Sequence, residues 1–301
     1  MNPYLEVARQ GRNEWWRYLL SLGLILFMWI VVGSLPVLVL GSAAAFDNNP
    51  ATAVTSTGLV GFDPLLIFVV TIGSFIPLFL TTLFVVRYIH GRPIRTLFTA
   101  HPSIRWGRML AGFGIWLGLS TLMSIAEEII YPGRYELTFQ PATFMAFLLP
   151  AILLLGIQTS AEELFLRGYL MQGLGLIFKR GWIVALISAT VFAALHWSNP
   201  EVSVNATLLM LYYFSFGLFA ALIILRDGGL ELALGIHAAN NMFSALLANY
   251  ADSAIQSPSI FLDKVLDPVY GLIAPLIGMG LFYLIFFVWK SPRRAIDPIQ
   301  G

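Results

Sequence analysis

Long stretches without a single charged residue constrain this chain more than any other feature. The longest of these uncharged runs are residues 18–46, 64–86, 137–161, 202–225 and 268–289. About 20 apolar residues are enough to cross a hydrocarbon core roughly 30 Å thick. Only 11% of the 301 residues are charged, whereas soluble domains carry roughly 25%. The sequence therefore excludes a large water-soluble domain and predicts a polytopic membrane protein.

The fold class that follows is all-α, a bundle of about eight transmembrane helices. The predicted spans are residues 18–42, 64–86, 109–130, 142–177, 181–197, 203–225, 230–248 and 268–289. No connection is long enough for a separate soluble domain, so residues 1–301 form one integral membrane domain. The first apolar run is too long for a cleavable signal peptide and is expected to be a retained helix. There is no cysteine, which excludes disulfides and thiolate metal ligands.

The distribution of basic residues predicts the orientation of the chain. Positively charged residues concentrate in cytoplasmic loops of membrane proteins. With eight spans, 14 of the 17 basic residues fall on the side that holds both termini: Arg9, Arg12, Arg17, Arg87, Arg92, Arg95, Arg105, Arg108, Lys179, Arg180, Arg226, Lys290, Arg293 and Arg294. The opposite side holds Arg134 and Lys264. We expect a multi-pass protein of the cell membrane, inner or plasma, with both termini cytoplasmic. The net charge of +1 gives no indication of a nucleic-acid partner.

Two acidic pairs interrupt the apolar sequence. Ionisable groups within a membrane are costly and are functional candidates by default. Glu163 and Arg167 are four residues apart and can form an ion pair on one helix face, whereas Glu162 lies about 100° away around the helix axis. The second pair, Glu127 and Glu128, has no basic residue at that spacing, and Pro132 ends its helix. We expect the second pair to be a solvated helix end.

Two of the four histidines also lie in predicted spans. His196 follows Phe192 at the far end of its span, and His237 precedes Asn241 by one helical turn. A lone histidine on an apolar face is more often a hydrogen-bonded core residue, but two of them with a glutamate pair favour a functional site. Counting 1.5 Å per residue from the helix ends places Glu162 and His196 at matching heights, about 25 Å from the 179–180 turn, but His237 only about 12 Å from its own turn. A meeting point of the three in the cytoplasmic half of the bilayer is consistent with these heights if the 178–181 hairpin projects about 10 Å beyond the membrane surface. Glu231, near the end of its span, is expected to lie at the interface.

These residues resemble the motifs of the CPBP family of intramembrane proteases, also called the Abi family. The family includes CAAX prenyl endopeptidases of the Ras-converting type (CAAX prenyl protease 2) and bacteriocin-processing and self-immunity proteins. Its motifs here are Glu162-Glu163-x-x-x-Arg167, Phe192-x-x-x-His196 and His237-x-x-x-Asn241. Each motif alone is weak, but all three occur in order, and each lies in a predicted span. The resemblance covers residues 140–250 and implies that the catalytic core lies there.

The resemblance implies an endopeptidase that hydrolyses a peptide bond of a membrane-tethered protein or peptide, with prenylated CAAX tails among the candidate substrates. In this reading Glu162 is the general base on a water that His196 helps to position. His237 and Asn241 stabilise the oxyanion. Glu163 and Arg167 hold the helix and its charges, and Phe192 packs beneath His196. The chemistry is reasonable in itself, because hydrolysis needs an ionised base near water and donors where negative charge develops.

The sequence leaves the role of metal open. Glu162, His196 and His237 could supply three ligands to a divalent metal such as zinc, with water in the fourth position. The family has been described both as metalloprotease and as glutamic-type protease. Neither histidine has a carboxylate close in sequence that could orient it, which favours a mechanism without a tightly bound metal. A non-enzymatic scaffold or immunity protein is one alternative function. A transporter is the other, but no inverted repeat or paired broken helix supports it.

Overall fold

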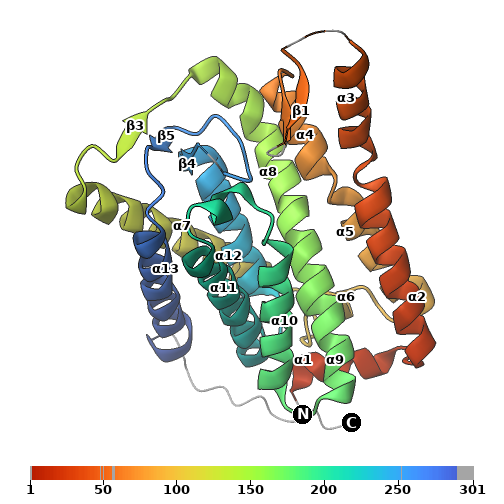
Figure 1. Ribbon diagram of the computed structural model, residues 1–301. Coiled ribbons are helices and arrows are strands. Elements are labelled where there is room, and N and C mark those ends of the chain that lie inside the picture. The colour runs from red at the N-terminus through yellow and green to blue at the C-terminus, as the bar shows by residue number, and fades with distance from the viewer. Residues whose placement is uncertain (1, 48, 50, 56–57, 252, 290–301) are drawn as a thin grey trace.

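The computed structural model describes residues 2–47, 49, 51–55, 58–251 and 253–289, and it is a bundle of helices with a few short strands at one end (Figure 1). The helices of the first half are α1 (Pro3–Glu6), η1 (Val7–Gln10), α2 (Trp15–Leu26), η2 (Phe27–Val32), α3 (Leu35–Phe46), α4 (Pro64–Gly73), α5 (Ile76–Phe84), η3 (Val85–Ile89), α6 (Arg95–Phe98) and α7 (Trp106–Ile130). Of these, η1 is a 3-10 helix, and η2 and η3 are π-helical turns.

The second half holds the residues of the family motifs. Its helices are α8 (Pro141–Glu163), η4 (Leu164–Leu170), α9 (Met171–Ile177), α10 (Gly181–Leu195), η5 (Pro200–Ser203), α11 (Ala206–Asp227), α12 (Glu231–Met242), η6 (Phe243–Leu247), α13 (Pro268–Tyr283) and η7 (Leu284–Trp289). Of these, η5 is a 3-10 helix, and η4, η6 and η7 are π-helical.

The prediction of an all-α membrane bundle is confirmed, but the number of spans is lower than predicted. Within the described residues, six helical segments are long and apolar enough to cross a membrane: Trp15–Phe46, Pro64–Ile89, Trp106–Ile130, Pro141–Ile177, Ala206–Asp227 and Pro268–Trp289. The predicted spans 181–197 and 230–248 are helical but shorter. Helix α10 has 15 residues, and α12 has 12 residues that include a glutamate, a histidine and two asparagines. Eight helical segments were recognised correctly, and two of them lack the length or apolarity of a full span.

Local sequence signals set where several helices begin. Asp63 caps α4, where its carboxylate accepts a hydrogen bond from the Leu66 amide at 3.0 Å. Asp267 caps α13 in the same way, with the Val269 amide at 2.9 Å. In both helices a proline occupies the next position, where its missing N–H costs nothing. These caps place the ends of apolar helices at aspartates, which are stabilised in a polar environment.

Helix α12 is the central element of the bundle for function. It packs against α7, α8 and α11, and eight of its twelve residues are buried. Two glycines allow its close approach to α7. A side chain at Gly235 would meet the Met109 carbonyl oxygen at 2.2 Å, and one at Gly112 would meet the Leu232 carbonyl oxygen at 3.0 Å. Because α12 lies between α7 and α8, His237 is carried to the face of α8 that bears the first acidic pair.

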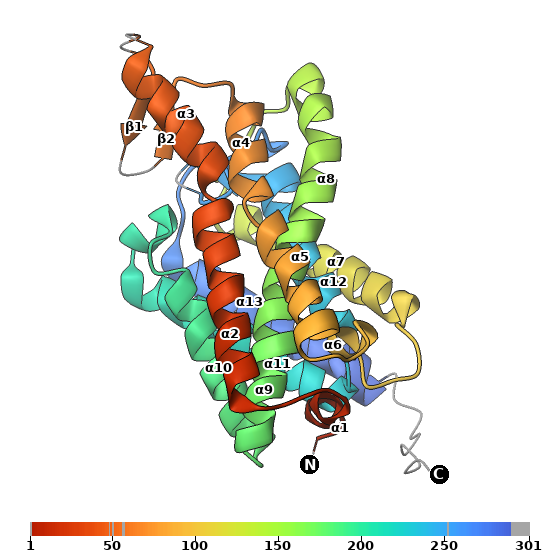
Figure 2. The same ribbon diagram turned by 90° about the vertical axis from the view of Figure 1, so that its right-hand side faces the viewer.

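The loops separate into two groups at opposite ends of the bundle (Figures 1 and 2). At one end the N-terminal segment meets the 87–108 loop through a hydrogen bond from the Arg12 amide to the His90 carbonyl, 2.8 Å. That loop in turn pairs with the α11–α12 turn, where Thr99 bridges Gly229. At the other end lie the antiparallel hairpin of β1 (Ala53–Thr55) and β2 (Gly58–Val60) and the sheet β3-β5-β4, formed by Tyr135–Leu137, Phe261–Asp263 and Ala248–Tyr250. Strand β5 is antiparallel to β3 and parallel to β4.

Glu231 lies at the end of the bundle where the 87–108 loop meets the α11–α12 turn, as expected for an interfacial residue, but it is not solvated. Its side chain is fully buried and forms an ion pair with Arg105, with the Glu231 Oε2–Arg105 Nη2 distance at 2.7 Å. Arg105 and Arg108 also pair with Asp227, at the end of α11. The structure therefore uses Glu231 to join the start of α12 to the start of α7.

Candidate active site

The first acidic pair closes α8, and its second glutamate is the hub of a buried charge cluster. Glu163 Oε1 accepts from Arg167 Nη1 at 3.0 Å, which is the ion pair that the spacing predicts. The same oxygen lies 2.9 Å from His237 Nδ1, a contact that no sequence spacing predicts. Glu163 and Arg167 are both fully buried, and the Arg167 guanidinium lies over the Phe192 ring at 4.5 Å. The cluster thus connects α8, η4, α10 and α12.

Glu163 determines how the His237 ring is presented. A carboxylate that is paired with arginine acts as an acceptor, so the Nδ1 of His237 carries the proton that it donates. The other nitrogen, Nε2, lies 3.7 Å from Glu162 Oε2. That distance is beyond direct hydrogen bonding. Glu162 Oε2 is buried and has no hydrogen-bond partner among the described residues. Two acceptor atoms therefore face each other without a donor between them.

Glu162 is oriented by a polar side chain that the sequence analysis did not single out. Gln158, one turn earlier on α8, donates from Nε2 to Glu162 Oε1 at 2.5 Å. The side-chain oxygen of Gln158, Oε1, accepts from Asn241 Nδ2 at 3.0 Å. Asn241 is therefore brought to the first acidic pair, but its contact is with Gln158. The signal for Gln158 was present, because it is a polar residue in an uncharged run at the i−4 position of Glu162.

His196 stands between two aromatic rings at the end of α10. Its Nδ1 lies 2.8 Å from the Phe192 carbonyl oxygen, and the Phe192 ring packs against it at 4.4 Å between centroids. The predicted packing of Phe192 beneath His196 is present. On the other side the Tyr213 ring stacks on the imidazole at 4.3 Å. These contacts hold the ring and direct Nδ1 away from the cavity.

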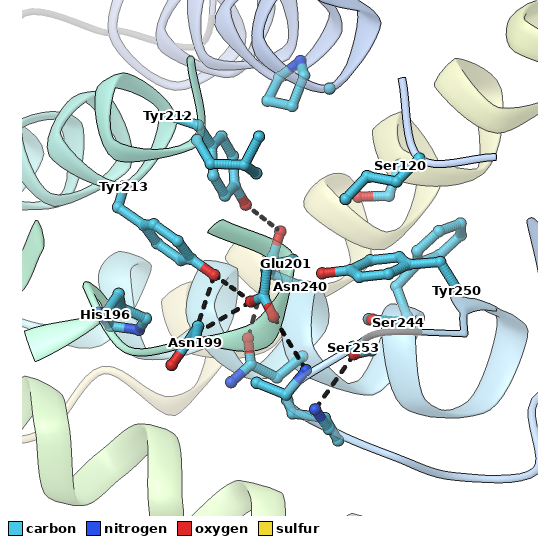
Figure 3. Close-up of a pocket in the computed structure, with 18 of the residues that line it drawn as sticks. Ser120, His196, Asn199, Glu201, Tyr212, Tyr213, Asn240, Ser244, Tyr250 and Ser253 are labelled. Carbon is cyan, nitrogen blue, oxygen red and sulfur yellow. Dashed lines mark hydrogen bonds between the residues drawn. The ribbon is translucent and has the colours of Figure 1, made fainter. Parts of the chain in front are cut away.

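Glu162 is one of the residues that line a cavity of about 460 Å³. Figure 3 shows other residues of the cavity wall, with His196 and Glu201 among them. Glu162, His196 and Asn241 line it. His237, Glu163, Arg167 and Phe192 are not among its lining residues, and His237 is only 3% exposed. Four of the seven predicted site residues therefore stand behind the cavity wall. The structure brings all seven into one connected region, with Glu162, His196 and Asn241 on the cavity wall and the other four directly behind it, where His237 Nε2 lies 3.7 Å from Glu162 Oε2.

Glu201 is a second buried carboxylate of this cavity, and the sequence analysis missed it. It accepts from the Tyr213 hydroxyl, from Asn199 Nδ2 at 3.0 Å and from the Ala254 amide at 3.0 Å (Figure 3). These bonds tie the loop after His196 to Ala254 across the cavity. Asn199 is only two residues away, but the Tyr213 hydroxyl and the Ala254 amide are 12 and 53 residues from Glu201, so no spacing rule could have found the site they form with it.

The three residues proposed as metal ligands do not assemble into a metal centre. Within the described ranges, no group of three or more histidine, aspartate or glutamate side chains is arranged to hold an ion. One argument against a metal is nevertheless wrong. His237 does have an orienting carboxylate, Glu163, which is the arrangement that commonly supports metal-bound histidines. The divalent metal stays a prediction for experiment.

The second acidic pair differs from its expected state in one of its two members. Helix α7 ends at Ile130, before Pro132, as predicted. Glu128 is half-buried and accepts from the Gly133 and Tyr135 amides, at 2.7 and 3.0 Å. Glu127 is only 6% exposed. It accepts from the Tyr135 hydroxyl at 2.7 Å and lies 3.2 Å from Arg134 Nη2. The expectation of a solvated pair is therefore wrong for Glu127, because the following loop folds back over it.

Comparison with known proteins agrees with this geometry. Residues 141–243 match the family described as type II CAAX prenyl endopeptidase Rce1-like. This segment contains α8 to α12 and every residue of the three motifs. The chain is also 32% identical, over 270 residues, to the uncharacterized protein YyaK of Bacillus subtilis (strain 168), an alignment that covers 87% of each chain. The chain belongs to the Rce1-like family of CAAX-type membrane proteases. No solved structure matches it.

Membership of the Rce1-like family supports intramembrane endopeptidase activity in general. It also agrees with a multi-pass protein in contact with the lipid bilayer and with a membrane-associated substrate. The match ends one residue after Met242, the last residue of α12, and begins at the first residue of α8. The elements that carry the motif residues therefore lie within the matched segment, whereas the cavity is also lined by residues of α7 and α13, among them Glu127 and Tyr270.

Proposed function

We propose that this protein is an intramembrane endopeptidase in which Glu162 activates a water molecule for attack on a peptide bond. The observation that carries the proposal is the buried, unpartnered Oε2 of Glu162 on the wall of a cavity, 3.7 Å from His237 Nε2. A buried acceptor without a donor is costly and calls for a functional explanation. A water that donates to Glu162 would satisfy it and would be held ready for reaction.

The roles of the other residues follow from their contacts. Glu162 takes the proton of the attacking water as general base. Gln158 keeps its other oxygen fixed, since it donates to Oε1. His237, with Nδ1 bonded to Glu163, presents Nε2 beside the base, where it can take up a proton and then donate to the oxyanion. Arg167 pairs with the same carboxylate oxygen, Glu163 Oε1, at 3.0 Å.

His196 and Asn241 complete the reacting surface in this proposal. Both line the cavity with Glu162. With Nδ1 bonded to the Phe192 carbonyl, His196 carries its proton there when neutral, so Nε2 is the atom that can accept from the water. Asn241 uses one amide hydrogen on Gln158, and its second hydrogen can bond to the developing oxyanion. In this proposal the catalytic core lies within residues 140–250.

The substrate in this proposal is a membrane-tethered protein or peptide, with prenylated CAAX-type tails as one class. The protein lies in the cell membrane with both termini on the cytoplasmic side, because the termini share a side with most basic residues. The described structure supports that grouping, since the N-terminal segment, the 87–108 loop and the α11–α12 turn meet at one end.

Proteolysis of tethered peptides in liposomes tests the proposal. Wild type, Glu162→Gln and Thr159→Val are compared at equal amounts of folded protein. Thr159 is a matched control, because it lies on the same helix and its hydroxyl bonds only to the backbone carbonyls of Leu155 and Gly156, one turn earlier. We expect cleavage by wild type and by Thr159→Val and a loss of about 10²–10⁴-fold in Glu162→Gln. Cleavage that persists in Glu162→Gln contradicts the assignment of the base.

A chelator arm and a binding arm separate the remaining readings. Our mechanism routes no step through a metal, so we expect cleavage to survive a strong chelator, and inhibition that zinc reverses would establish the metal role instead. A scaffold would keep partner binding in Glu162→Gln and would show no proteolysis in wild type. A transporter would move a solute across the liposome membrane without cutting it.

A further inference from the structure

Three side-chain amides form a chain of hydrogen bonds that ends at Glu162. Asn240 Nδ2 donates to Asn241 Oδ1 at 3.3 Å, and Asn241 Nδ2 donates to Gln158 Oε1 at 3.0 Å. Gln158 Nε2 then donates to Glu162 Oε1 at 2.5 Å. We call Asn240, Asn241 and Gln158 the amide relay, and all three line the cavity. Gln158 and Asn241 already have roles in the proposed reaction, whereas Asn240 has none.

The first contacts of the amide relay decide which way it faces. The Tyr212 hydroxyl donates to Asn240 Oδ1 at 3.4 Å (Figure 3), and Trp116 Nε1 donates to the same oxygen at 3.4 Å. An indole N–H can donate but cannot accept. Trp116 therefore selects the oxygen of Asn240 and turns its nitrogen toward Asn241. Trp116 is buried and packs against the Phe282 ring, so this donor is held in place.

The direction set at Asn240 passes along the amide relay to the reacting groups. Asn241 has to present its oxygen to Asn240, which leaves its nitrogen for Gln158. Gln158 accepts with its oxygen, which leaves its nitrogen for Glu162. A reversed relay would place the Gln158 oxygen against the carboxylate, and two acceptors without a hydrogen between them are unfavourable. The observed direction also keeps the Asn241 nitrogen on the Gln158 side, where the proposed reaction uses its second hydrogen.

We propose that Asn240 is a positioning residue for peptide hydrolysis, and that Trp116 and Tyr212 act through it. The inference rests on the proposed protease function and adds to it residues that the three motifs do not name. Asn240 sets the direction of the amide relay, and the relay keeps a donor on Glu162 and the donor of Asn241 in place. Because Asn240 acts on the reacting groups and not on substrate binding, its loss lowers kcat and leaves KM unchanged.

A double-mutant cycle tests whether Asn240 acts through Asn241. Cleavage of a tethered peptide in liposomes is measured for Asn240→Leu, Asn241→Ala and the double variant, at equal amounts of folded protein. We expect Asn240→Leu to lower kcat by about tenfold on its own, because it disturbs a hydrogen bond to a charged group. In the variant without Asn241 it should lower kcat by less than about twofold, because the route to the reacting groups is already cut.

Tyr212→Phe is the conservative second variant, because it removes the hydroxyl and keeps the ring. One donor to Asn240 remains, so kcat should fall by only about threefold, and by nothing measurable in Asn241→Ala. Tyr18→Phe is the matched control. The Tyr18 hydroxyl also donates to an asparagine oxygen, Asn13 Oδ1 at 2.7 Å, but outside the cavity, and kcat should not change in either background. If Asn240→Leu does not fold, the Tyr212→Phe cycle decides.

The outcomes separate failure of this inference from failure of the proposed function. If wild type cuts the peptide and Glu162→Gln does not, but the losses in Asn240→Leu and Asn241→Ala multiply, the protease assignment stands and the positioning role is wrong. A rise in KM without a fall in kcat would make Asn240 a substrate contact and would also overturn the inference. If wild type cuts no peptide, or Glu162→Gln cuts as fast as wild type, the proposed function fails and the positioning role with it.

Discussion

The two acidic pairs of this protein have almost the same sequence, and one glutamate of each, Glu162 or Glu127, lines the same cavity, but their contacts differ. The first, Glu162 and Glu163, ends α8 beside a cavity, and its second member is the hub of a buried cluster with Arg167 and His237. The second pair, Glu127 and Glu128, ends α7, and its contacts are with the loop that follows. Adjacent glutamates at a helix end are therefore not a functional signal in themselves.

The difference arises from what each pair can contact. An arginine one turn later, on the same helix, provides the first pair with a counter-ion that is itself fully buried. Pro132 removes that option from the second pair, because the helix stops before another turn is complete. Arg134 and Tyr135 then reach Glu127 from the loop. One pair is thus built into the bundle, and the other fastens a loop to a helix end.

Arg167→Met should have the largest effect on stability. It leaves Glu163 buried without its guanidinium partner, and loss of one member of a buried ion pair costs about 3–5 kcal/mol. The matched change at the second pair, Arg134→Met, also removes the ion pair with Asp263. It should still cost less, because Glu127 keeps its hydrogen bond from Tyr135 and Asp263 keeps its hydrogen bond from the Val265 amide. Thermal unfolding in detergent measures both. Equal losses would mean that the first pair is no more embedded than the second.

His237→Ala should have the next largest effect, and on activity. It removes the group beside Glu162 that donates to the oxyanion, and loss of one such donor costs about 10²–10³-fold in kcat. Glu163 would still have Arg167, so the fold should survive. Peptide cleavage in liposomes gives the number, with Tyr135→Phe, which removes the corresponding contact of Glu127, as the control. A drop confined to KM would contradict the assigned role.

Gln158→Leu should have an intermediate effect. It removes the donor to Glu162 Oε1, and a hydrogen bond to a charged group contributes about 1.5–3 kcal/mol. We expect a fall of roughly 10–100-fold in kcat. Restoration by Gln158→Asn is not expected, because the shorter side chain does not span the distance. Unchanged kcat would show that Glu162 needs no second partner.

Glu127→Gln should have the smallest effect of these changes. A glutamine can still accept from the Tyr135 hydroxyl, so only the ion pair with Arg134 is lost. We expect a stability loss of about 1 kcal/mol and a cleavage rate within threefold of wild type. Chemical unfolding and peptide cleavage check the two parts. A large loss of activity would place the second pair in the reaction.

The sequence was sufficient for the elements that depend on local pattern. Uncharged runs located the helices, the four-residue spacing of Glu163 and Arg167 located their ion pair, and Pro132 located the end of α7. The count of 1.5 Å per residue from the helix ends was consistent with Glu162, His196 and His237 lying in one region. The short helices α10 and α12 were counted as full spans because the uncharged sequence continues past the residues at which they end, Leu195 and Met242.

The remaining features depend on contacts between distant segments. The bond from His237 to Glu163 joins residues 74 positions apart, and the Glu201 bond to the Ala254 amide joins residues 53 apart. The burial of Glu127 depends on a loop that folds back. No periodicity in the sequence encodes these contacts, because they arise from packing of α12 between α7 and α8 and from the path of the loops.

The most direct test of the account compares the two pairs in a single experiment. Cleavage of a tethered peptide is measured for Glu162→Gln and Glu127→Gln at equal amounts of folded protein in the same liposomes. The account predicts that Glu162→Gln loses at least about 10²-fold of the wild-type rate, while Glu127→Gln stays within threefold. Comparable losses in both variants, or a greater loss in Glu127→Gln, would contradict the claim that only the first pair reacts.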